Sequence, residues 1–372
     1  ARNKIHDLFL EHVMQQAPGY RKLIDMTGAP IMPTPAAVGL IMETIAKREH
    51  LNLIGVDIGG ATTDVFSVFD GVFNRTVSAN LGMSYSISNV LAEAGLANIM
   101  RWVPFNIDEQ TLRNRIKNKM VRPTTIPQTL DELQIEQAIA REALRLALIH
   151  HKSLATGLKG VQQERTISDA FEQQASGKSL VDMLKLDLIV GSGGILSHAP
   201  RRIQSMLMMV DAYEPLGFTM LSVDSIFMMP HLGVLSTINE NAATDVFVRD
   251  CMVYLGTCVA PIGRLKDGER LAEYELTFPD GRVVKDQLKM GEVRLFPLGL
   301  NQKARLAMQP VKTVNLGQGA GTPVSREVQG GVVGLLLDGR GRPLQLPADE
   351  PARVAALTKW FESVDLYPRS QG

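Results

Sequence analysis

The sequence predicts an α/β protein: a mixed sheet with flanking helices, followed by a smaller β-rich region that ends in a helix. Two apolar runs on either side of a Gly-Gly turn indicate antiparallel strands, and a third run follows an Asp70-Gly71 turn. Long segments of helical periodicity come next, and short alternating apolar runs follow residue 250. With 372 residues, 45% of them apolar, the chain is long enough for about two domains with buried cores.

The first fifty residues contain two helical patterns, over residues 5–16 and 36–49. Between them lie prolines at positions 30, 33 and 35, which exclude both helix and central strand and predict an extended segment. Next we expect a strand, the glycine turn, a second strand to Phe69 and a third strand through Val77. This order predicts an antiparallel meander at the start of a domain.

Helical and strand patterns alternate from Gly82 onward. Helices are expected over residues 84–94, 108–120 and 131–151, and the last has acidic residues in its first turn. Residues 152–180 are polar and weakly patterned, which predicts a loop. A short buried strand over residues 186–190 then leads into a glycine loop, and a helix is expected from about residue 199 to residue 212.

From residue 250 to residue 372 the pattern predicts a β-rich domain. The expected strands cover residues 252–259, 272–278, 293–296, 304–314 and 332–337. A final helix is expected over residues 351–364, with Pro351 in its first turn.

Composition and charge argue against several classes of partner. Thirty-nine basic residues balance thirty-nine acidic residues, so the net charge gives no general attraction to nucleic acid or to a membrane. The apolar stretches are too short to span a bilayer and the N-terminus lacks a signal-peptide pattern, so we expect a cytoplasmic protein. Cys251 and Cys258 fall on opposite faces of a predicted strand, which argues against a disulfide. His150 and His151 are interpreted as ordinary helix-end residues.

The most informative motif is Asp-Ile-Gly-Gly-Ala-Thr-Thr-Asp at residues 57–64, between two apolar runs. Glycines at such a turn let backbone N–H groups approach phosphate oxygens. Because a carboxylate repels a polyphosphate unless a cation lies between them, the two acids imply Mg²⁺. We expect Asp57 and Asp64 to lie exposed beside the loop as catalytic and metal-binding carboxylates. The residues expected to bind phosphate are Gly59, Gly60, Thr62 and Thr63.

The spacing of this motif differs from that of P-loops and of dinucleotide-binding Rossmann loops, and no other strand-then-glycine segment supplies either pattern. A tight β-hairpin whose glycines serve only the turn remains an alternative. Turn chemistry alone does not require acids at both ends of the loop and two threonines, which favours ligand binding.

A second candidate site is the glycine loop formed by Gly191, Ser192, Gly193 and Gly194. It follows a buried strand and precedes a helix, an order that lets a base or a phosphate approach the backbone near the positive end of the helix. Glycines at such a turn also serve packing alone, so the loop is weak evidence in isolation. Its presence in the same chain as the hairpin strengthens the prediction of a nucleotide site.

Together, the hairpin at residues 57–64 and the glycine loop at residues 191–194 resemble the second phosphate motif and the adenosine motif of the actin-like (ribonuclease H-like) ATPases. The resemblance implies an actin-like ATPase lobe that binds ATP. It also implies that Gly59, Gly60 and Thr62 meet the β- and γ-phosphates. Asp57 and Asp64 would hold Mg²⁺ through water, and the loop at residues 191–194 would pass beneath the adenosine.

Within this superfamily, the segments 32–38 and 56–65 resemble the MutL/GlmL proteins associated with coenzyme-B12-dependent glutamate mutase. These proteins are unrelated to the mismatch-repair protein that shares the name MutL. The resemblance covers residues 1 to about 240 and implies an ATP-driven reactivase that helps to remove damaged cobalamin from a mutase. Mutase subunits would then be the partners. The chain has no Asp-x-His-x-x-Gly motif, so no cobalamin-ligating histidine is expected.

Actin-like ATPases have two lobes, and this sequence has only one motif of the Asp-x-Gly type. We therefore expect residues 1–50 to be a remnant of, or a connection to, a missing first lobe, and residues 51–245 to form the ATPase lobe. Residues 250–372 would be the β-rich domain. With half of the cleft absent, we expect this chain alone to be an inactive ATPase. The sequence leaves open whether the protein is a homodimer.

Two other functions remain open. The first is a hydantoinase or oxoprolinase-type amidohydrolase, because that family has a similar Asp-x-Gly-Gly turn. The second is a non-catalytic module that keeps an actin-like lobe as a scaffold for interactions. The segment 32–38 favours the reactivase over the amidohydrolase.

Overall fold

The structure is a computed structural model that describes residues 4, 8, 12, 16–29, 31–156 and 179–368. The helix predicted over residues 5–16 and the loop predicted over residues 152–180 therefore lie mostly outside the described residues. The first described helices are α2 (Tyr20–Met26) and α3 (Thr34–Glu49). Helix α3 begins where the sequence predicts an extended proline segment to end, because Pro33 is its N-cap and a proline is tolerated in the first turn.

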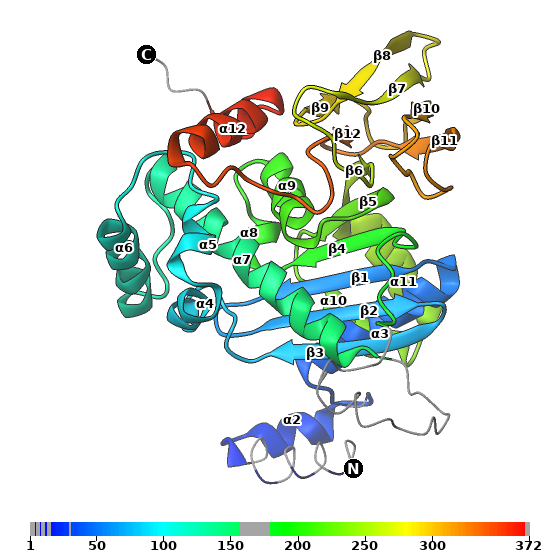
Figure 1. Cartoon of the computed structure of the whole chain (residues 1–372). Helices are drawn as coiled ribbons and strands as arrows, with labels where there is room; N and C mark the ends of the chain where they lie inside the picture. The colour runs from blue at the N-terminus through cyan, green and yellow to red at the C-terminus, as the bar shows by residue number, and fades with distance from the viewer. Residues whose placement is uncertain are drawn as a thin grey trace, which may run out of the picture.

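An eight-stranded mixed sheet forms the centre of the molecule (Figure 1). Its strand order is β3-β2-β1-β4-β5-β6-β12-β9. The strands are β1 (Leu53–Ile58), β2 (Thr63–Phe69), β3 (Val72–Ser78), β4 (Leu188–Ser192), β5 (Gly217–Asp224), β6 (Met252–Ala260), β9 (Val293–Phe296) and β12 (Leu335–Asp338). Strand β1 is antiparallel to β2 and parallel to β4, so the predicted meander and the predicted mixed sheet are confirmed.

Helices cover both faces of this sheet. On one face, Ile54, Val56 and Ile58 of β1 belong to a core shared with α7 and α9, and on the other face Leu53 packs in a core with α3. Helices α3, α10 and α11 are drawn behind the sheet in Figure 1, and α7 in front of it. Besides α3, the helices of these layers have the following bounds: α4 (Ile87–Ala94), α5 (Leu96–Met100), α6 (Glu109–Val121), α7 (Leu130–Leu154), α8 (Gly194–Ser197), α9 (Arg202–Tyr213), α10 (Met229–Ser236), α11 (Glu240–Val246) and the π-helix Phe247–Cys251.

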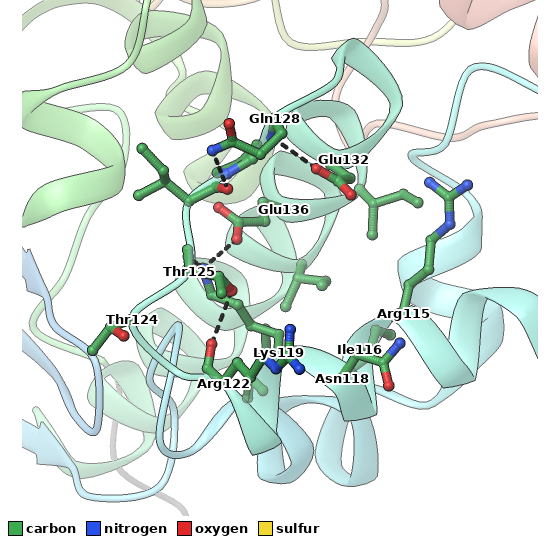
Figure 2. Close-up of a pocket in the computed structure, with 15 residues that line it drawn as sticks. Arg115, Ile116, Asn118, Lys119, Arg122, Thr124, Thr125, Gln128, Glu132 and Glu136 are labelled. Carbon is green, nitrogen blue, oxygen red and sulfur yellow. Dashed lines mark hydrogen bonds and ion pairs between the residues drawn. The ribbon is translucent and has the colours of Figure 1, made fainter.

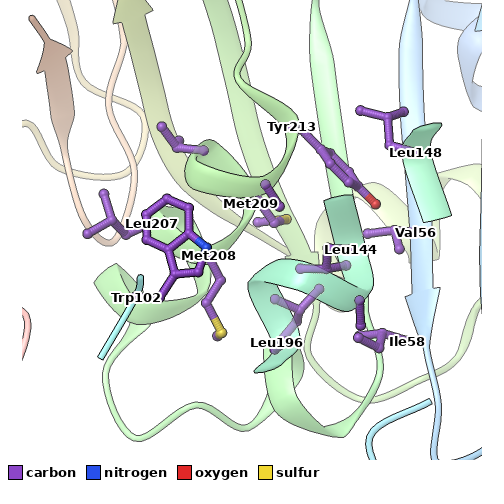
Figure 3. Packing of buried hydrophobic residues seen from close by; sticks show 14 of the residues in the cluster. Val56, Ile58, Trp102, Leu144, Leu148, Leu196, Leu207, Met208, Met209 and Tyr213 are labelled. Atoms are coloured by element: carbon purple, nitrogen blue, oxygen red, sulfur yellow. The ribbon is translucent and has the colours of Figure 1, made fainter. Parts of the chain in front are cut away.

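The long helix α7 has local signals at its start and an apolar face along its length. Thr129 is its N-cap and accepts a hydrogen bond from the Glu132 N–H at 3.3 Å. Further along, Leu144 and Leu148 pack towards Val56 of the sheet (Figure 3). Figure 3 also shows methionines of α9 inside this core, where Met206, Met208 and Met209 are fully buried.

The strands after residue 250 are divided between two sheets. Strands β6, β9 and β12 extend the large sheet, whereas four others form an antiparallel sheet in the order β11-β10-β7-β8. These four are β7 (Arg270–Thr277), β8 (Val283–Lys289), β10 (Lys303–Pro310) and β11 (Val324–Gln329), and helix α12 (Glu350–Ser363) follows them. The α/β fold class with a β-rich region is confirmed, and the predicted domain boundaries stay a prediction.

Cys251 and Cys258 are both free and buried. The interpretation of His151 as an ordinary helix-end residue is wrong. Its side chain is 0% exposed, and its two ring nitrogens lie 3.0 Å from Thr76 Oγ1 and 2.7 Å from Ser67 Oγ. These contacts join the end of α7 to strands β2 and β3.

Acidification is expected to destabilise the protein through His151. Burial, with smaller contributions from His150 and Lys152, lowers the pKa of His151 from 6.5 to about 4. Below pH 6.5 His151 therefore binds a proton in the unfolded chain, whereas in the folded chain it binds one only below about pH 4. The free energy of unfolding should fall by about 2 kcal/mol between pH 7 and pH 5 through this group. Urea titrations at both pH values measure this loss. The wild type and the control His150→Gln should both show it, and His151→Gln should not.

Candidate functional site

A row of polar side chains crosses the large sheet at one end of its central strands. Asp57 of β1 pairs in register with Asp64 of β2 on one side and with Ser192 of β4 on the other. Residues opposite one another on neighbouring strands project to the same face of a sheet, with Cβ atoms about 5 Å apart. The structure therefore brings the hairpin motif and the second glycine loop together, although about 130 residues separate them in the chain.

The two carboxylates of this row lie in an environment that opposes their ionisation. Asp64 is only 4% exposed, and burial raises its pKa to about 6, against an opposing effect of Arg75. Burial also raises the pKa of Asp57 to about 6, with smaller contributions from the negative charges of Asp64 and Asp224. The expectation that both acids lie exposed on a loop is wrong, because Asp57 and Asp64 are strand residues. Neighbouring carboxylates with raised pKa values, here half-buried Asp57 and buried Asp64, are typical of functional sites.

Two buried polar atoms in the row have no hydrogen-bond partner among the described residues, namely Asp64 Oδ1 and Ser192 Oγ. Buried polar groups are nearly always paired in folded proteins, because an unpaired one costs about 1–3 kcal/mol. A cation with its bound water would give Asp64 and Ser192 the partners that they lack. The donor set thus fits a hydrated Mg²⁺, which commonly takes only one or two carboxylates and completes its coordination with water and phosphate.

Within the described part of the chain, no cluster of three or more His, Cys, Asp or Glu side chains forms a closed metal cage. The negative charge of Asp224, at the end of β5, also raises the pKa of Asp57. Its carboxylate already accepts hydrogen bonds from the N–H groups of Ile226, Phe227 and Met229, at 2.9 to 3.2 Å. Asp224 therefore holds the loop after β5 and adds negative charge to the site.

The turn between β1 and β2 presents backbone donors. The Gly59 N–H donates to the Thr62 carbonyl oxygen at 2.9 Å, and the Ser84 N–H donates to the Gly60 carbonyl oxygen at 2.9 Å. The N–H groups of Gly60 and Thr62 donate no backbone hydrogen bond to any described residue. A Cβ atom at Gly60 would lie 2.3 Å from Ser84 Oγ, so a larger residue there would require the Ser84 side chain to move. Free N–H groups on a compact turn suit an anionic ligand.

The second glycine loop touches the first. Gly193 has φ +96°, and a Cβ atom there would lie 2.0 Å from the carbonyl oxygen of Ile58, the residue before Gly59. Gly193 thus allows the end of β4 to lie against the end of β1. Gly194 begins the short helix α8 and has open space around it. Gly191 has a packing role, because a Cβ atom there would lie 2.7 Å from Met209 Sδ.

A cavity of about 880 Å³ opens beside these two turns. Its walls are the hairpin turn, the segment 123–130 between α6 and α7, the first turns of α7, and the loop from Gly194 to Gln204. Gly59, Gly60 and Gly194 line it together. Its volume falls within the range of about 300–1,000 Å³ that is usual for small-molecule sites.

The segment between α6 and α7 is fixed by polar contacts, which Figure 2 shows from the side of a smaller adjoining cavity of about 520 Å³. Lys119 forms an ion pair with Glu136 at 2.5 Å and donates a hydrogen bond to the Thr125 carbonyl oxygen. The Gln128 N–H donates to Glu132 at 2.7 Å. These contacts hold one wall of the larger cavity in place.

The large cavity and the carboxylate row lie on opposite sides of the hairpin turn. Ile58 lines the cavity and belongs to the core on the α7 side, so Asp57, one residue earlier on the strand, projects to the α3 side. Asp57 and Asp64 do not line the cavity. An elongated ligand that reaches both regions must therefore cross the end of the sheet over the two glycine turns.

Thr63, another of the predicted ligand residues, serves the fold. Its side chain is buried, and its hydroxyl donates to the carbonyl oxygen of Leu81. Sequence reasoning also missed cavity residues outside the two glycine motifs. Among them are Lys119, Glu136, Gln137, His198 and Gln204.

Fold and site together define the class: an α/β protein whose candidate ligand site lies where its central strands end in glycine turns, the usual place for ligands in such sheets. The chain belongs to the MutL protein family, because the family model "MutL protein" matches residues 1–251. This result confirms the resemblance found in the sequence.

Protein MutL from Clostridium tetanomorphum is 27% identical to this chain over 219 residues, which cover 54% of this chain and 45% of that protein. The match thus spans less than half of the relative's length. Two solved structures show partial similarity, each at 12% identity and a TM-score of 0.27. The first is component A of (R)-2-hydroxyglutaryl-CoA dehydratase from Acidaminococcus fermentans, with coverage of 55% of this chain and 65% of that one. The second is the activator of 2-hydroxyisocaproyl-CoA dehydratase from Clostridium difficile with bound ADPNP, with coverage of 56% and 67%.

No helix in the described part of the chain combines the length and the apolar character that a membrane span needs.

Proposed function

We propose that this chain is the ATP-binding part of a chaperone-like accessory ATPase that reactivates a coenzyme-B12-dependent mutase of the glutamate mutase type. Membership of the MutL family and the residues of the site support this proposal. In this assignment the protein works in the cytoplasm, and the mutase subunits are its partners. The intact protein would hydrolyse ATP.

The observation that carries the nucleotide part of the proposal is the pairing of Asp57 with Asp64 and Ser192 beside two glycine turns. The triphosphate would lie over the free N–H groups of the Gly60 turn, with Mg²⁺ held through water by the two carboxylates. The bound metal would neutralise negative charge on the phosphates, as it does in other phosphoryl-transfer sites. The nucleoside would occupy the cavity of about 880 Å³ on the α7 side.

Calorimetric titration of the intact protein with ATP, in the presence of Mg²⁺ and then of EDTA, tests this proposal. We expect one site with Mg²⁺ and at least about tenfold weaker binding without it, because the two carboxylates then face the phosphates directly. Turnover of a hydantoin or of 5-oxoproline without a partner enzyme would instead support the amidohydrolase. Absence of ATP binding under both conditions would support the non-catalytic module.

A further inference from the structure

The segment that follows helix α12 turns back towards the large cavity. Helix α12 ends at Ser363, and Asp365 has a left-handed conformation with φ +49°. The Leu366 N–H donates to the Phe361 carbonyl oxygen at 2.8 Å, which is the bond expected when a helix ends with a left-handed residue. The reversal of direction brings residues 365–368 against α7 and α9, and Pro368 lines the cavity.

Contacts with α9 hold this segment in place. Arg201 forms an ion pair with Asp365 at 2.8 Å. The Gln204 Nε2 group donates to the Leu366 carbonyl oxygen at 3.1 Å, and the Leu366 side chain is buried in the core shared with α7 and α9. Residues 365–368 therefore form part of the cavity wall.

Two glutamines in that wall form a connected pair. Gln137 of α7 and Gln204 of α9 are each 0% exposed, and both line the cavity. The Gln137 Nε2 group donates to Gln204 Oε1 at 3.1 Å, and the Tyr367 hydroxyl donates to Gln137 Oε1 at 2.7 Å. Burial raises the pKa of Tyr367, which keeps its hydroxyl protonated and able to donate.

Each glutamine amide has a remaining donor. An amide nitrogen carries two hydrogens, and the hydrogen bonds found among the described residues use one on Gln137 and one on Gln204. A buried N–H donor without a partner destabilises the fold, and a ligand that accepts its hydrogen bond would remove this cost. Neutral N–H donors match the ring nitrogens of a base or the oxygens of a ribose, whereas phosphate binds better to cations and to free backbone N–H groups.

We propose that Gln137 and Gln204 recognise the nucleoside half of the nucleotide, and that Tyr367 is the positioning residue that orients the Gln137 amide. This inference rests on the proposed nucleotide function. Loss of the Tyr367 hydroxyl would remove the bond that fixes the Gln137 amide oxygen and would free the amide to rotate.

Tyr367→Phe tests this inference, because it retains the ring that packs edge-to-face on Phe361 at 5.5 Å and removes only the hydroxyl. Calorimetry on the intact protein should compare Mg²⁺-ATP with Mg²⁺-tripolyphosphate, which lacks a nucleoside. We expect the affinity for ATP to fall about tenfold and the affinity for tripolyphosphate to stay unchanged. Tyr274→Phe is the matched control. The Tyr274 hydroxyl, on β7 of the smaller sheet, accepts a hydrogen bond from Arg294, and its loss should change neither affinity.

The outcomes separate the two proposals. If the wild type binds both ligands and Tyr367→Phe weakens both equally or neither, the role of Tyr367 is refuted and the nucleotide site stands. If the wild type binds neither ligand, the proposed function fails and this inference fails with it. Hydrogen exchange gives a second readout: ATP should increase protection of residues 364–368 more than tripolyphosphate does, and equal protection by the two ligands would count against nucleoside contact at this wall.

Discussion

Asp64→Asn is expected to make the folded protein more stable and to abolish Mg²⁺-dependent ATP binding. Burial raises the pKa of Asp64 from 3.8 to about 6, so the ionised side chain destabilises the fold by about 3 kcal/mol above pH 6. The penalty is absent below pH 3.8, where the side chain is protonated in both states, and it grows as the pH rises to 6. Asparagine is neutral and nearly the same size, so the free energy of unfolding at pH 8 should rise by up to about 3 kcal/mol.

The same substitution removes a negative charge that Mg²⁺ needs, so the affinity for Mg²⁺-ATP should fall by about a hundredfold or more. Urea titration at pH 4 and pH 8, together with calorimetry, measures both effects. Asp70→Asn is the control. Asp70 lies in the turn between β2 and β3, where it forms an exposed ion pair with Lys185. Its substitution should change neither quantity by more than about 0.5 kcal/mol. A destabilised Asp64→Asn protein that still binds Mg²⁺-ATP normally would mean that Asp64 has a structural role only.

Gly193→Ala is expected to destabilise the protein by about 3 kcal/mol or more. The backbone at this position has φ +96°, which L-residues rarely adopt, and the new methyl group would lie 2.0 Å from the Ile58 carbonyl oxygen. The two strands that carry Asp57 and Ser192 would have to separate. ATP binding should be lost along with stability, because the carboxylate row and the glycine turns would no longer be aligned.

Gly194→Ala is the matched control for stability, since no atom lies within 4 Å of the position of its Cβ and its φ is not positive. Its free energy of unfolding should stay within about 1 kcal/mol of the wild-type value. Equal stability of the two alanine variants would show that contact between the glycine loops does not contribute to the fold.

The parts of the site that could be predicted are those encoded by neighbouring residues. The Gly59-Gly60 turn lies between two short apolar runs, and Gly191 to Gly194 directly follow another, so strand, turn and helix could be recognised within short windows. The register of Asp57 with Ser192 could not be predicted, because strands β1 and β4 pair across about 130 residues and a shift by one residue would reverse every side chain. The hydrogen bond from Thr63 to the Leu81 carbonyl oxygen could not be predicted either, because it depends on the path of the chain after β3. The sequence therefore suggested Thr63 as a ligand residue.

Several elements were missed for identifiable physical reasons. Strand β8 is a polar edge strand with little alternation of apolar residues, and β5 was overlooked although its apolar run ends in an acid, Asp224, a signal that could have located it. Gln137 also had a signal, because it interrupts the buried face of a helix next to Ala138 and Ile139. Its link to Tyr367 joins residues 230 positions apart and depends on tertiary structure alone.

The most direct test of the central proposal is a crystal structure of the intact protein with Mg²⁺ and a non-hydrolysable ATP analogue. The proposal predicts a metal ion joined through bound water to Asp57 and Asp64, phosphates over the turns at Gly60 and Gly194, and the nucleoside between α7 and α9. A nucleotide bound elsewhere, or bound here with the metal remote from both carboxylates, would contradict it.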